Sequence, residues 1–169
     1  MTTVDLRRLR LRPGEEARDV HEIELAPIEL GGQRYVAVPE PVPAELTVTR
    51  AANGTALRLR LEVQLHGPCY RCLEDAALDQ SVDAREYQAE DSQGDEELES
   101  AYVTDDKVDL SSWARDSVVL ALPDKILCRP DCAGLCPICG KNLNHEPHGH
   151  EGEDIDPRWA RLAELRDSL

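Results

Sequence analysis

Six cysteines give this 169-residue chain its most reactive side chains, and they fall into three closely spaced pairs. One pair lies in Cys136-Pro-Ile-Cys139-Gly140, where two thiolates are near enough to bind one Zn²⁺. The proline and glycine suit a tight turn that directs backbone N–H groups at the sulfurs. The other candidate ligands are Cys69 and Cys72, Cys128 and Cys132, and the downstream histidines His145, His148 and His150. Ligands grouped in this way predict a metalloprotein.

Disulfide bonds and redox dithiols are the other common uses of paired cysteines. The first residues, MTTVDLRRLRLRPGEE, contain no apolar signal segment, and no stretch is long and apolar enough to span a membrane. We therefore expect a reducing, cytoplasmic location, where paired cysteines are more often metal ligands. No strand–helix–strand alternation surrounds Cys69, as a thioredoxin-like site would require. Structural zinc is favoured over catalytic zinc, because thiolate pairs favour closed four-coordinate sites.

The net charge of −15 argues against a broad surface for nucleic-acid phosphates. Residues 83–106 hold ten acids and a single arginine, and we expect residues 89–106 to form an acidic loop. Such a loop is either merely solvated or engages a basic partner. On a strand, Arg8, Arg10 and Arg12 would share one face, which makes them candidate contacts for RNA or an acidic partner. A solvated strand face explains them equally well.

Residues 1–88 read mainly as β-structure, with strands expected at 4–11, 21–25, 33–38, 45–50, 55–65 and 76–88. Asn53-Gly54 predicts a hairpin with a type I′ turn, which needs positive φ at both central residues. After it, leucine or valine alternates with polar residues from Leu57 to Leu65, as in a half-buried antiparallel strand. This strand runs into Cys69, so the first Cys-x-x-Cys is predicted at the tip of a long hairpin.

The apolar period changes after the acidic tract. A helix is expected within residues 107–123, with Asp109 as N-cap and Pro123 beyond its end. The Cys/His segment follows at 128–150, and Asp156-Pro157 predicts a short C-terminal helix over 156–168. We expect one α+β domain over 1–169: antiparallel sheet and hairpins, a mid-chain helix, a zinc-binding segment and a C-terminal helix. No phosphate-binding glycine loop or Ser/His/Asp pattern is present, so no small-molecule substrate is expected.

Four segments in a fixed order resemble the bacterial YceD family. They are PCYRCLEDA, DLSSWARDSVVLALP, a C-x3-C that leads into AGLCPICGKNLN, and IDPRWARLAEL, and together they span roughly Cys69 to Leu165. The family is linked to accumulation of the 23S rRNA of the large ribosomal subunit. The resemblance implies a non-enzymatic, cytoplasmic factor in the synthesis, processing or stability of that rRNA. Its implied partners are large-subunit rRNA or pre-50S particles, ribosomal proteins or rRNA-processing factors, and not a membrane.

The resemblance also implies how the ligands pair. Members of the Gram-positive type often carry a C-x-C where this chain has His148-Gly-His150, and imidazole can replace thiolate on zinc. One or two structural zinc ions are implied. The favoured sets are Cys69, Cys72, Cys128 and Cys132 for one site, and Cys136, Cys139, His148 and His150 for the other. A rival zinc ribbon would join Cys69 and Cys72 to Cys136 and Cys139, and the hairpin position does not decide between them.

Two other functions remain open at this point. A generic zinc-ribbon interaction module could use the acidic insert to engage a basic partner. A zinc-dependent hydrolase is the third and weakest possibility.

Overall fold

The structure is a computed structural model that describes residues 2–91 and 99–150. The chain divides into two compact units, Met1–Cys132 and Ala133–Leu169. The described part is a mostly antiparallel β-protein with one α-helix and two cysteine-containing clusters. No helix in these described ranges is long and apolar enough to cross a membrane.

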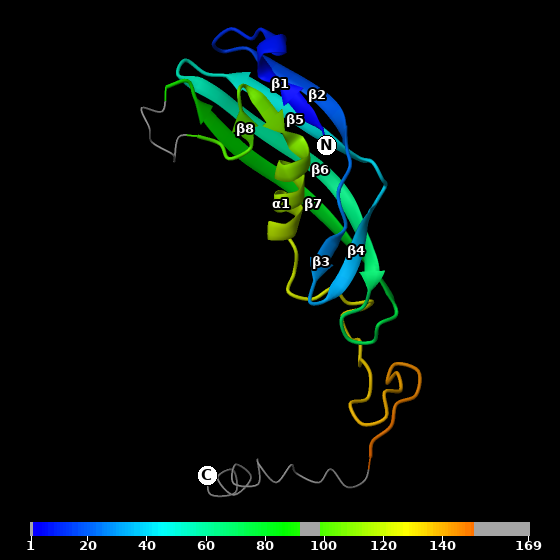
Figure 1. The fold of residues 1–169 in the computed structure, drawn as a ribbon. Coiled ribbons are helices and arrows are strands. Elements are labelled where there is room, and N and C mark those ends of the chain that lie inside the picture. The colour runs from blue at the N-terminus through cyan, green and yellow to red at the C-terminus, as the bar shows by residue number, and fades with distance from the viewer. Residues whose placement is uncertain (1, 92–98, 151–169) are drawn as a thin grey trace, which may run out of the picture. The chain divides into compact units, whose positions relative to one another are not determined.

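The first unit is built on a six-stranded antiparallel sheet (Figure 1). Strand β6 is its central member: β7 pairs with one edge of β6 along its whole length. The first half of the other edge pairs with β5 and the second half with β4. Strand β2 extends the sheet beyond β5, and β3 extends it beyond β4. The bounds are β2 Glu16–Ile23, β3 Ile28–Leu30, β4 Gln33–Val38, β5 Val42–Arg50, β6 Gly54–Pro68 and β7 Asp75–Ala89.

A second sheet of three short strands has the order β1-β9-β8, with β1 at Thr3–Asp5, β9 at Lys107–Asp109 and β8 at Val103–Thr104. Its β1 pairs antiparallel with β9, and Val4 lies opposite Val108. The 3-10 helix η1 (Leu6–Leu9) follows β1, and α1 (Leu110–Leu120) follows β9. The start of the chain is therefore fixed beside the start of α1.

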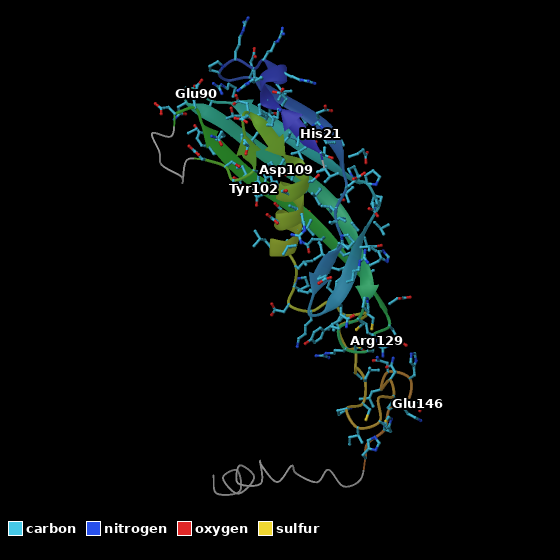
Figure 2. All side chains as sticks on the ribbon, in the orientation of Figure 1. His21, Glu90, Tyr102, Asp109, Arg129 and Glu146 are labelled. Carbon is cyan, nitrogen blue, oxygen red and sulfur yellow. The ribbon has the colours of Figure 1, made fainter. Side chains whose placement is uncertain are left out.

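Helix α1 confirms the mid-chain prediction. The Asp109 side chain accepts a hydrogen bond from the Ser112 backbone N–H at 3.1 Å, which is the expected N-cap. The helix contacts β7, β2 and β1 (Figure 1). Its buried face consists of Leu110, Trp113, Ala114 and Val118, and Ala121 is exposed just beyond the helix end. The Trp113 ring stacks on Tyr102, with ring centroids 6.1 Å apart; Figure 2 labels Tyr102 beside the helix.

The alternating segment of β6 confirms the sequence pattern. Every apolar position from Leu57 to Leu65 is buried, and the polar residues between them are partly or fully exposed. Strands β6 and β7 form the long hairpin, and residues 69–74 connect them. The first Cys-x-x-Cys therefore lies at the hairpin tip, as predicted.

Several local predictions were wrong. The strand expected at 4–11 ends at Asp5, because the Asp5 carboxylate accepts the Arg7 backbone N–H and begins η1. Arg10 then has a φ of 49°, so no extended segment places alternate arginines on one face. The strand expected at 21–25 runs instead from Glu16 to Ile23, and its pairing with β5 sets those bounds.

The turn predictions also changed. Asn53-Gly54 does form a hairpin connection between β5 and β6, but neither residue has a positive φ, so the turn is not type I′. Two-residue hairpin turns with positive φ at both residues occur instead at Gly31-Gly32, between β3 and β4, and at Asp105-Asp106, with φ of 52° and 60°, between β8 and β9. The Asp105-Asp106 turn lies within 89–106, so the end of this tract is not the loop that was expected. The expected C-terminal helix at 156–168 lies outside the described residues.

Candidate metal centres

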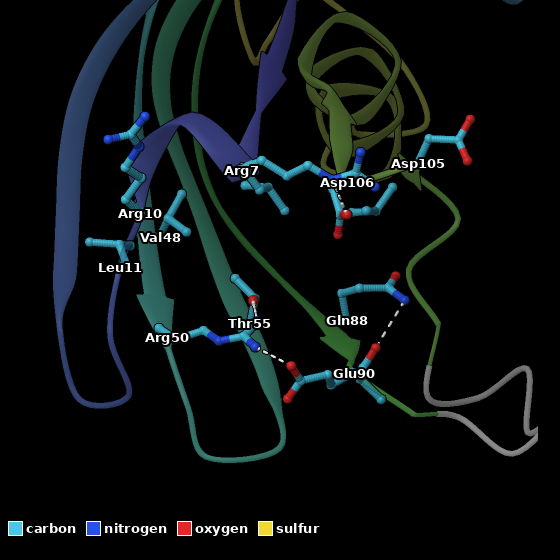
Figure 3. A pocket seen from close by; sticks show the side chains of 13 residues that line it. Arg7, Arg10, Leu11, Val48, Arg50, Thr55, Gln88, Glu90, Asp105 and Asp106 are labelled. Carbon is cyan, nitrogen blue, oxygen red and sulfur yellow. Dashed lines mark hydrogen bonds and ion pairs between the residues drawn. The ribbon is translucent and has the colours of Figure 1, made fainter.

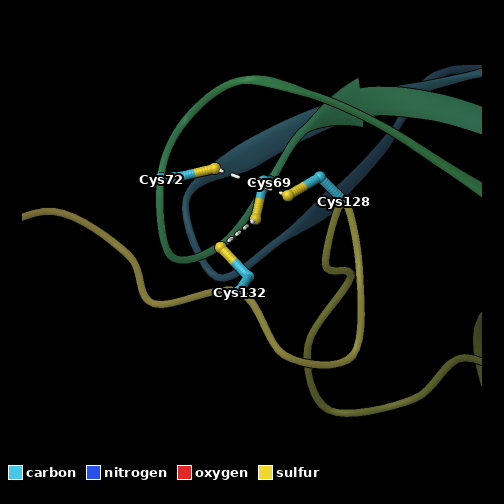
Figure 4. Close-up of side chains that lie close together, drawn as sticks. All are labelled: Cys69, Cys72, Cys128 and Cys132. Carbon is cyan, nitrogen blue, oxygen red and sulfur yellow. Dashed lines mark hydrogen bonds between the residues drawn. The ribbon is translucent and has the colours of Figure 1, made fainter. Parts of the chain in front are cut away.

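Four cysteine sulfurs from two separate segments meet at the tip of the β6–β7 hairpin (Figure 4). The Cys69 and Cys132 sulfurs are 3.8 Å apart, and the Cys72 and Cys128 sulfurs are 3.6 Å apart. All four sulfurs lie within 4.8 Å of one another. A tetrahedral zinc site with Zn–S bonds of about 2.3 Å requires sulfurs about 3.8 Å apart. The spacing therefore fits a Zn²⁺ with four thiolate ligands.

Packing at the end of β6 fixes the position of this cluster. Gly67 lets Tyr35 pack against the strand, since a Cβ at Gly67 would lie 2.5 Å from the Tyr35 ring. The Tyr35 hydroxyl then donates to the Pro68 carbonyl at 2.8 Å, one residue before Cys69. These contacts explain why the strand ends with the first ligand already in place.

Two further hydrogen bonds bring the second segment to the tip. The Tyr70 backbone N–H donates to the Ile126 carbonyl at 2.8 Å, which aligns the chain just before Cys128. The Arg71 guanidinium donates to the Cys132 carbonyl at 2.8 Å. The chain that follows α1 is thus attached to the hairpin through its backbone as well as through the sulfurs.

The electrostatics of the cluster suit a bound cation. Burial opposes ionisation of Cys69, but N–H groups of Cys72, Cys128 and Arg71 donate to its sulfur, and the pKa of Cys69 falls to about 6. Burial and the neighbouring thiols raise the pKa of Cys72 to about 12. Four adjacent thiolates are therefore unfavourable unless a metal ion supplies positive charge. Cys69, Cys72 and Cys132 are buried, as in a closed structural site.

The second unit contains a mixed cluster of Cys136, Cys139, His148 and His150, whose ligand atoms also lie within 4.8 Å of one another. The Cys139 sulfur is 3.1 Å from His148 Nε2, slightly closer than the about 3.5 Å of an ideal tetrahedral zinc site. His148 Nδ1 is 2.7 Å from the Glu146 carbonyl. A carbonyl only accepts, so Nδ1 carries the proton and Nε2 presents its lone pair to the centre.

A small scaffold supports the mixed cluster. The Cys136 N–H donates to the Lys141 carbonyl at 2.8 Å, and the Gly140 N–H donates to the Cys136 carbonyl at 2.9 Å. Gly140 has a φ of 73°, which the turn requires. Backbone N–H groups of Cys139 and Ile138 lower the pKa of Cys136 to about 6. Only Cys136 among the four ligands is buried, so this centre is far more open to solvent.

Sequence reasoning missed the residues that orient these ligands. The Asn144 side chain accepts the Ala133 N–H at 2.8 Å, and the Asn142 side chain accepts the Asn144 N–H at 2.9 Å. These asparagines stand in the NLN motif, which carried the family resemblance without revealing their role. The Glu146 carbonyl had no sequence signal, because any residue provides a carbonyl.

The structure groups the ligand atoms in the two sets that the family resemblance favoured. Each set lies within one compact unit, and the ribbon pairing of Cys69 and Cys72 with Cys136 and Cys139 is not the grouping found in the described residues. His66 and His145 belong to neither set.

The three candidate arginines have different surroundings. Arg8 lies 3.6 Å from the Asp5 carboxylate, and the Arg12 backbone N–H donates to the Glu15 carboxylate. Arg10 lines a hollow of about 610 Å³ at the end of the sheet (Figure 3). Two other arginines there are paired with acids, Arg7 with Asp106 at 2.7 Å and Arg50 with Glu90 at 2.6 Å. The hollow has mixed charge and does not form a basic stripe.

Comparison with known proteins places the chain in a family. The family model "Large ribosomal RNA subunit accumulation protein YceD" matches residues 57–166. Uncharacterized proteins of Mycobacterium bovis and Mycobacterium tuberculosis are each 37% identical over 169 residues, which cover 96% of this chain and 80% of the relative. An uncharacterized protein of Mycobacterium leprae is 43% identical over 70 residues, which cover 41% of this chain and 32% of the relative. No solved structure matches. The chain therefore belongs to the YceD family.

Proposed function

We propose that this protein is a non-enzymatic factor in the synthesis, processing or stability of the 23S rRNA of the large ribosomal subunit. The observation that carries the proposal is the family match over residues 57–166, which includes most of β6, all of β7 and both ligand sets. Structural zinc at the two centres would hold the hairpin tip and the Cys/His segment in shape, since Zn²⁺ cross-links its ligands without redox chemistry.

The ligand sets support a structural role. Each offers four protein ligands, whereas catalytic zinc usually keeps a coordination position for water or substrate. The all-cysteine set is also largely buried, which removes it from any substrate. We therefore expect no metal-dependent turnover of RNA or protein.

The charge distribution supports a limited and specific contact with the precursor particle. The net charge is −15, and Arg7, Arg50 and Arg58 are each bonded to an acidic side chain. Nonspecific RNA binding requires clustered cations that release counterions from phosphates. The partners we expect are pre-50S particles, which the protein engages through ribosomal proteins, processing factors or a small region of rRNA.

Sedimentation tests this proposal. Full-length tagged protein from growing cells should co-sediment with precursors of the large subunit, and mild ribonuclease treatment should move it to lighter fractions. The small-subunit fractions serve as the internal control. A protein that stays at the top of the gradient in all conditions contradicts the proposal.

A generic zinc module is the second candidate, and the acidic tract favours it. Ten acids against one arginine in residues 83–106 suit a basic protein partner of any kind. Recovery of a single basic partner from ribosome-free fractions, with no large-subunit precursor, would support this candidate.

A further inference from the structure

The two Cys-x-x-Cys turns of this chain have the same backbone structure. In each, the residue after the second cysteine donates its N–H to the first cysteine's carbonyl: Leu73 to Cys69 at 3.0 Å, and Gly140 to Cys136 at 2.9 Å. In each, the backbone N–H of the first cysteine donates to the carbonyl of the residue five positions later, which is Glu74 for Cys69 and Lys141 for Cys136. Both turns also need a left-handed residue, with φ of 63° at Leu73 and 73° at Gly140.

Only one of the two turns uses glycine at this position. A left-handed φ brings a Cβ too close to the following carbonyl, so glycine adopts it freely and leucine is strained. Packing does not offset the strain at Leu73, because its side chain is 54% exposed. Strained residues of this kind are typical of binding and active sites, where the side chain is needed for another purpose.

Tyr70 is the second large apolar side chain that is exposed in the same turn. It is 42% exposed. The Lys125 ammonium lies 5.0 Å from the ring centroid, and a Cβ at Gly31 would meet the ring at 3.1 Å. We call Tyr70 and Leu73 the apolar tip. Its backbone is fixed by the turn and by the neighbouring cysteine cluster, so little conformational freedom remains to be lost on binding.

We propose that the apolar tip is a docking surface for a basic segment of a large-subunit ribosomal protein. An apolar side chain of that segment would pack against Leu73, and its cations would face Glu74 and Asp75, which follow Leu73 directly and are exposed. This inference rests on the proposed function and deepens it, because it identifies the contact and the class of partner.

The chemistry of the tip favours protein over RNA. A leucine side chain has neither a hydrogen-bond donor nor a positive charge with which to bind a phosphate. The cations beside the tip are each directed at a group of this chain, Arg71 at the Cys132 carbonyl, Lys125 at the Tyr70 ring and Arg129 at the Asp131 carboxylate. Glu74, whose carboxylate also lies 3.8 Å from the Cys72 sulfur, and Asp75 would repel phosphates and attract a basic chain.

Immobilised, zinc-loaded full-length protein provides the test. The two probes are proteins extracted from purified large ribosomal subunits and protein-free 23S rRNA, each applied at about 0.15 M and about 1 M salt. We expect the wild type to retain a basic ribosomal protein, and to retain it at the higher salt because the anchor is apolar. Leu73→Gly and Leu73→Ala should each lower retention by about tenfold or more, because both remove the buried apolar contact.

The glycine variant separates docking from folding. Leu73→Gly gives the first turn the glycine that the second turn has at Gly140, and glycine adopts the left-handed φ without strain. We therefore expect this variant to keep its zinc content and to have an equal or higher thermal midpoint, but to lose retention of the ribosomal protein. Leu120→Ala is the matched control, because Leu120 is 86% exposed on α1, and it should bind like wild type. Wild-type retention by both Leu73 variants overturns the proposal. The proposal is also overturned if the protein retains only rRNA, if it self-associates through the tip, or if Leu120→Ala loses as much retention of the ribosomal protein as the Leu73 variants.

A depletion experiment in cells distinguishes failure of the docking proposal from failure of the proposed function. If depletion of the protein lowers 23S rRNA but Leu73→Gly restores it fully, the tip is not the contact and the proposed function stands. If depletion leaves 23S rRNA unchanged, the proposed function itself fails.

Discussion

The sulfurs of Cys69 and Cys132 lie 3.8 Å apart, although 63 positions separate the two residues in the chain. Strands β7, β8 and β9 and helix α1 all fall between them. A metal ion bound by both cysteines therefore closes a long loop through the second half of the first unit. Such an ion stabilises the fold because its four ligands are assembled only in the folded chain, so the free energy of metal binding adds to that of folding.

Metal content follows directly from the two ligand sets. Purified protein should carry about two zinc ions per chain, because eight ligands form two sets of four. His148→Ala combined with His150→Ala should lower the zinc content to about one ion per chain. The first unit should stay folded, since its four ligands are all cysteines and none of them is changed. Elemental analysis after gel filtration, with circular dichroism, measures both effects. Zinc-free protein with six free thiols and an intact fold contradicts a structural metal.

Acid should empty the two centres in a definite order. The Glu146 carbonyl and the Cys136 sulfur raise the pKa of metal-free His148, so protons compete with zinc there from a higher pH. Zinc binding is therefore complete above the histidine range and is lost as the pH falls through it. The all-cysteine centre contains no imidazole and is more buried, so it should release its ion at lower pH. A chromogenic chelator should report two steps in wild type and only the later step in the His148/His150 variant. A single step in wild type argues against independent centres.

The core under α1 should dominate the stability of the first unit. Trp113 is 1% exposed, and Trp113→Ala should cost about 3–5 kcal/mol of unfolding free energy. Leu120→Ala on the same helix is the control and should change stability by less than about 0.5 kcal/mol, because Leu120 projects into solvent. Urea titrations of zinc-loaded protein measure both. Similar losses for the two variants contradict the observed burial.

Sequence predicted those parts of the fold in which the local pattern and the tertiary packing agree. The apolar alternation from Leu57 to Leu65 required a strand with one buried face, and the Asp109 cap required a helix start. The ligand sets were favoured only through family resemblance, because the spacing of cysteines does not say which pairs meet in space.

Tertiary contacts decided the rest. Gly54 looked like a turn glycine, yet its role is to allow close approach: a Cβ there would lie 2.5 Å from the Gln88 carbonyl oxygen. The N-terminal arginines looked like one face of a strand, but the Asp5 side chain accepts the Arg7 backbone N–H and caps a 3-10 helix there. The strand β8 has only two residues and lies in the tract that read as acidic loop, and its partner β9 lies in the segment that read as helix, so neither was predicted.

An ion-pair cluster on the exposed face of β6 and β7 gives a prediction about pH. The hydrogen bond from Arg58 lowers the pKa of Asp83 to about 2, and Arg60 adds to the effect. Because the folded pKa lies below the unfolded value of about 3.9, the stabilisation is present above that value and disappears as the pH falls toward 2. Asp83→Asn should therefore lower the urea midpoint slightly at neutral pH, and the difference from wild type should vanish in acid. A difference that persists at low pH contradicts this pairing.

The ratio of 23S to 16S rRNA after depletion is the most direct measurement of the proposed role. Depletion should lower the ratio, and re-expressed wild type should restore it. Cys69→Ala combined with Cys72→Ala should fail to restore it, because the hairpin tip loses two of its four ligands, whereas the control Leu120→Ala should succeed. Immunoblots must show equal protein levels. An unchanged ratio and a normal large-subunit profile after depletion would contradict a role in 23S rRNA accumulation.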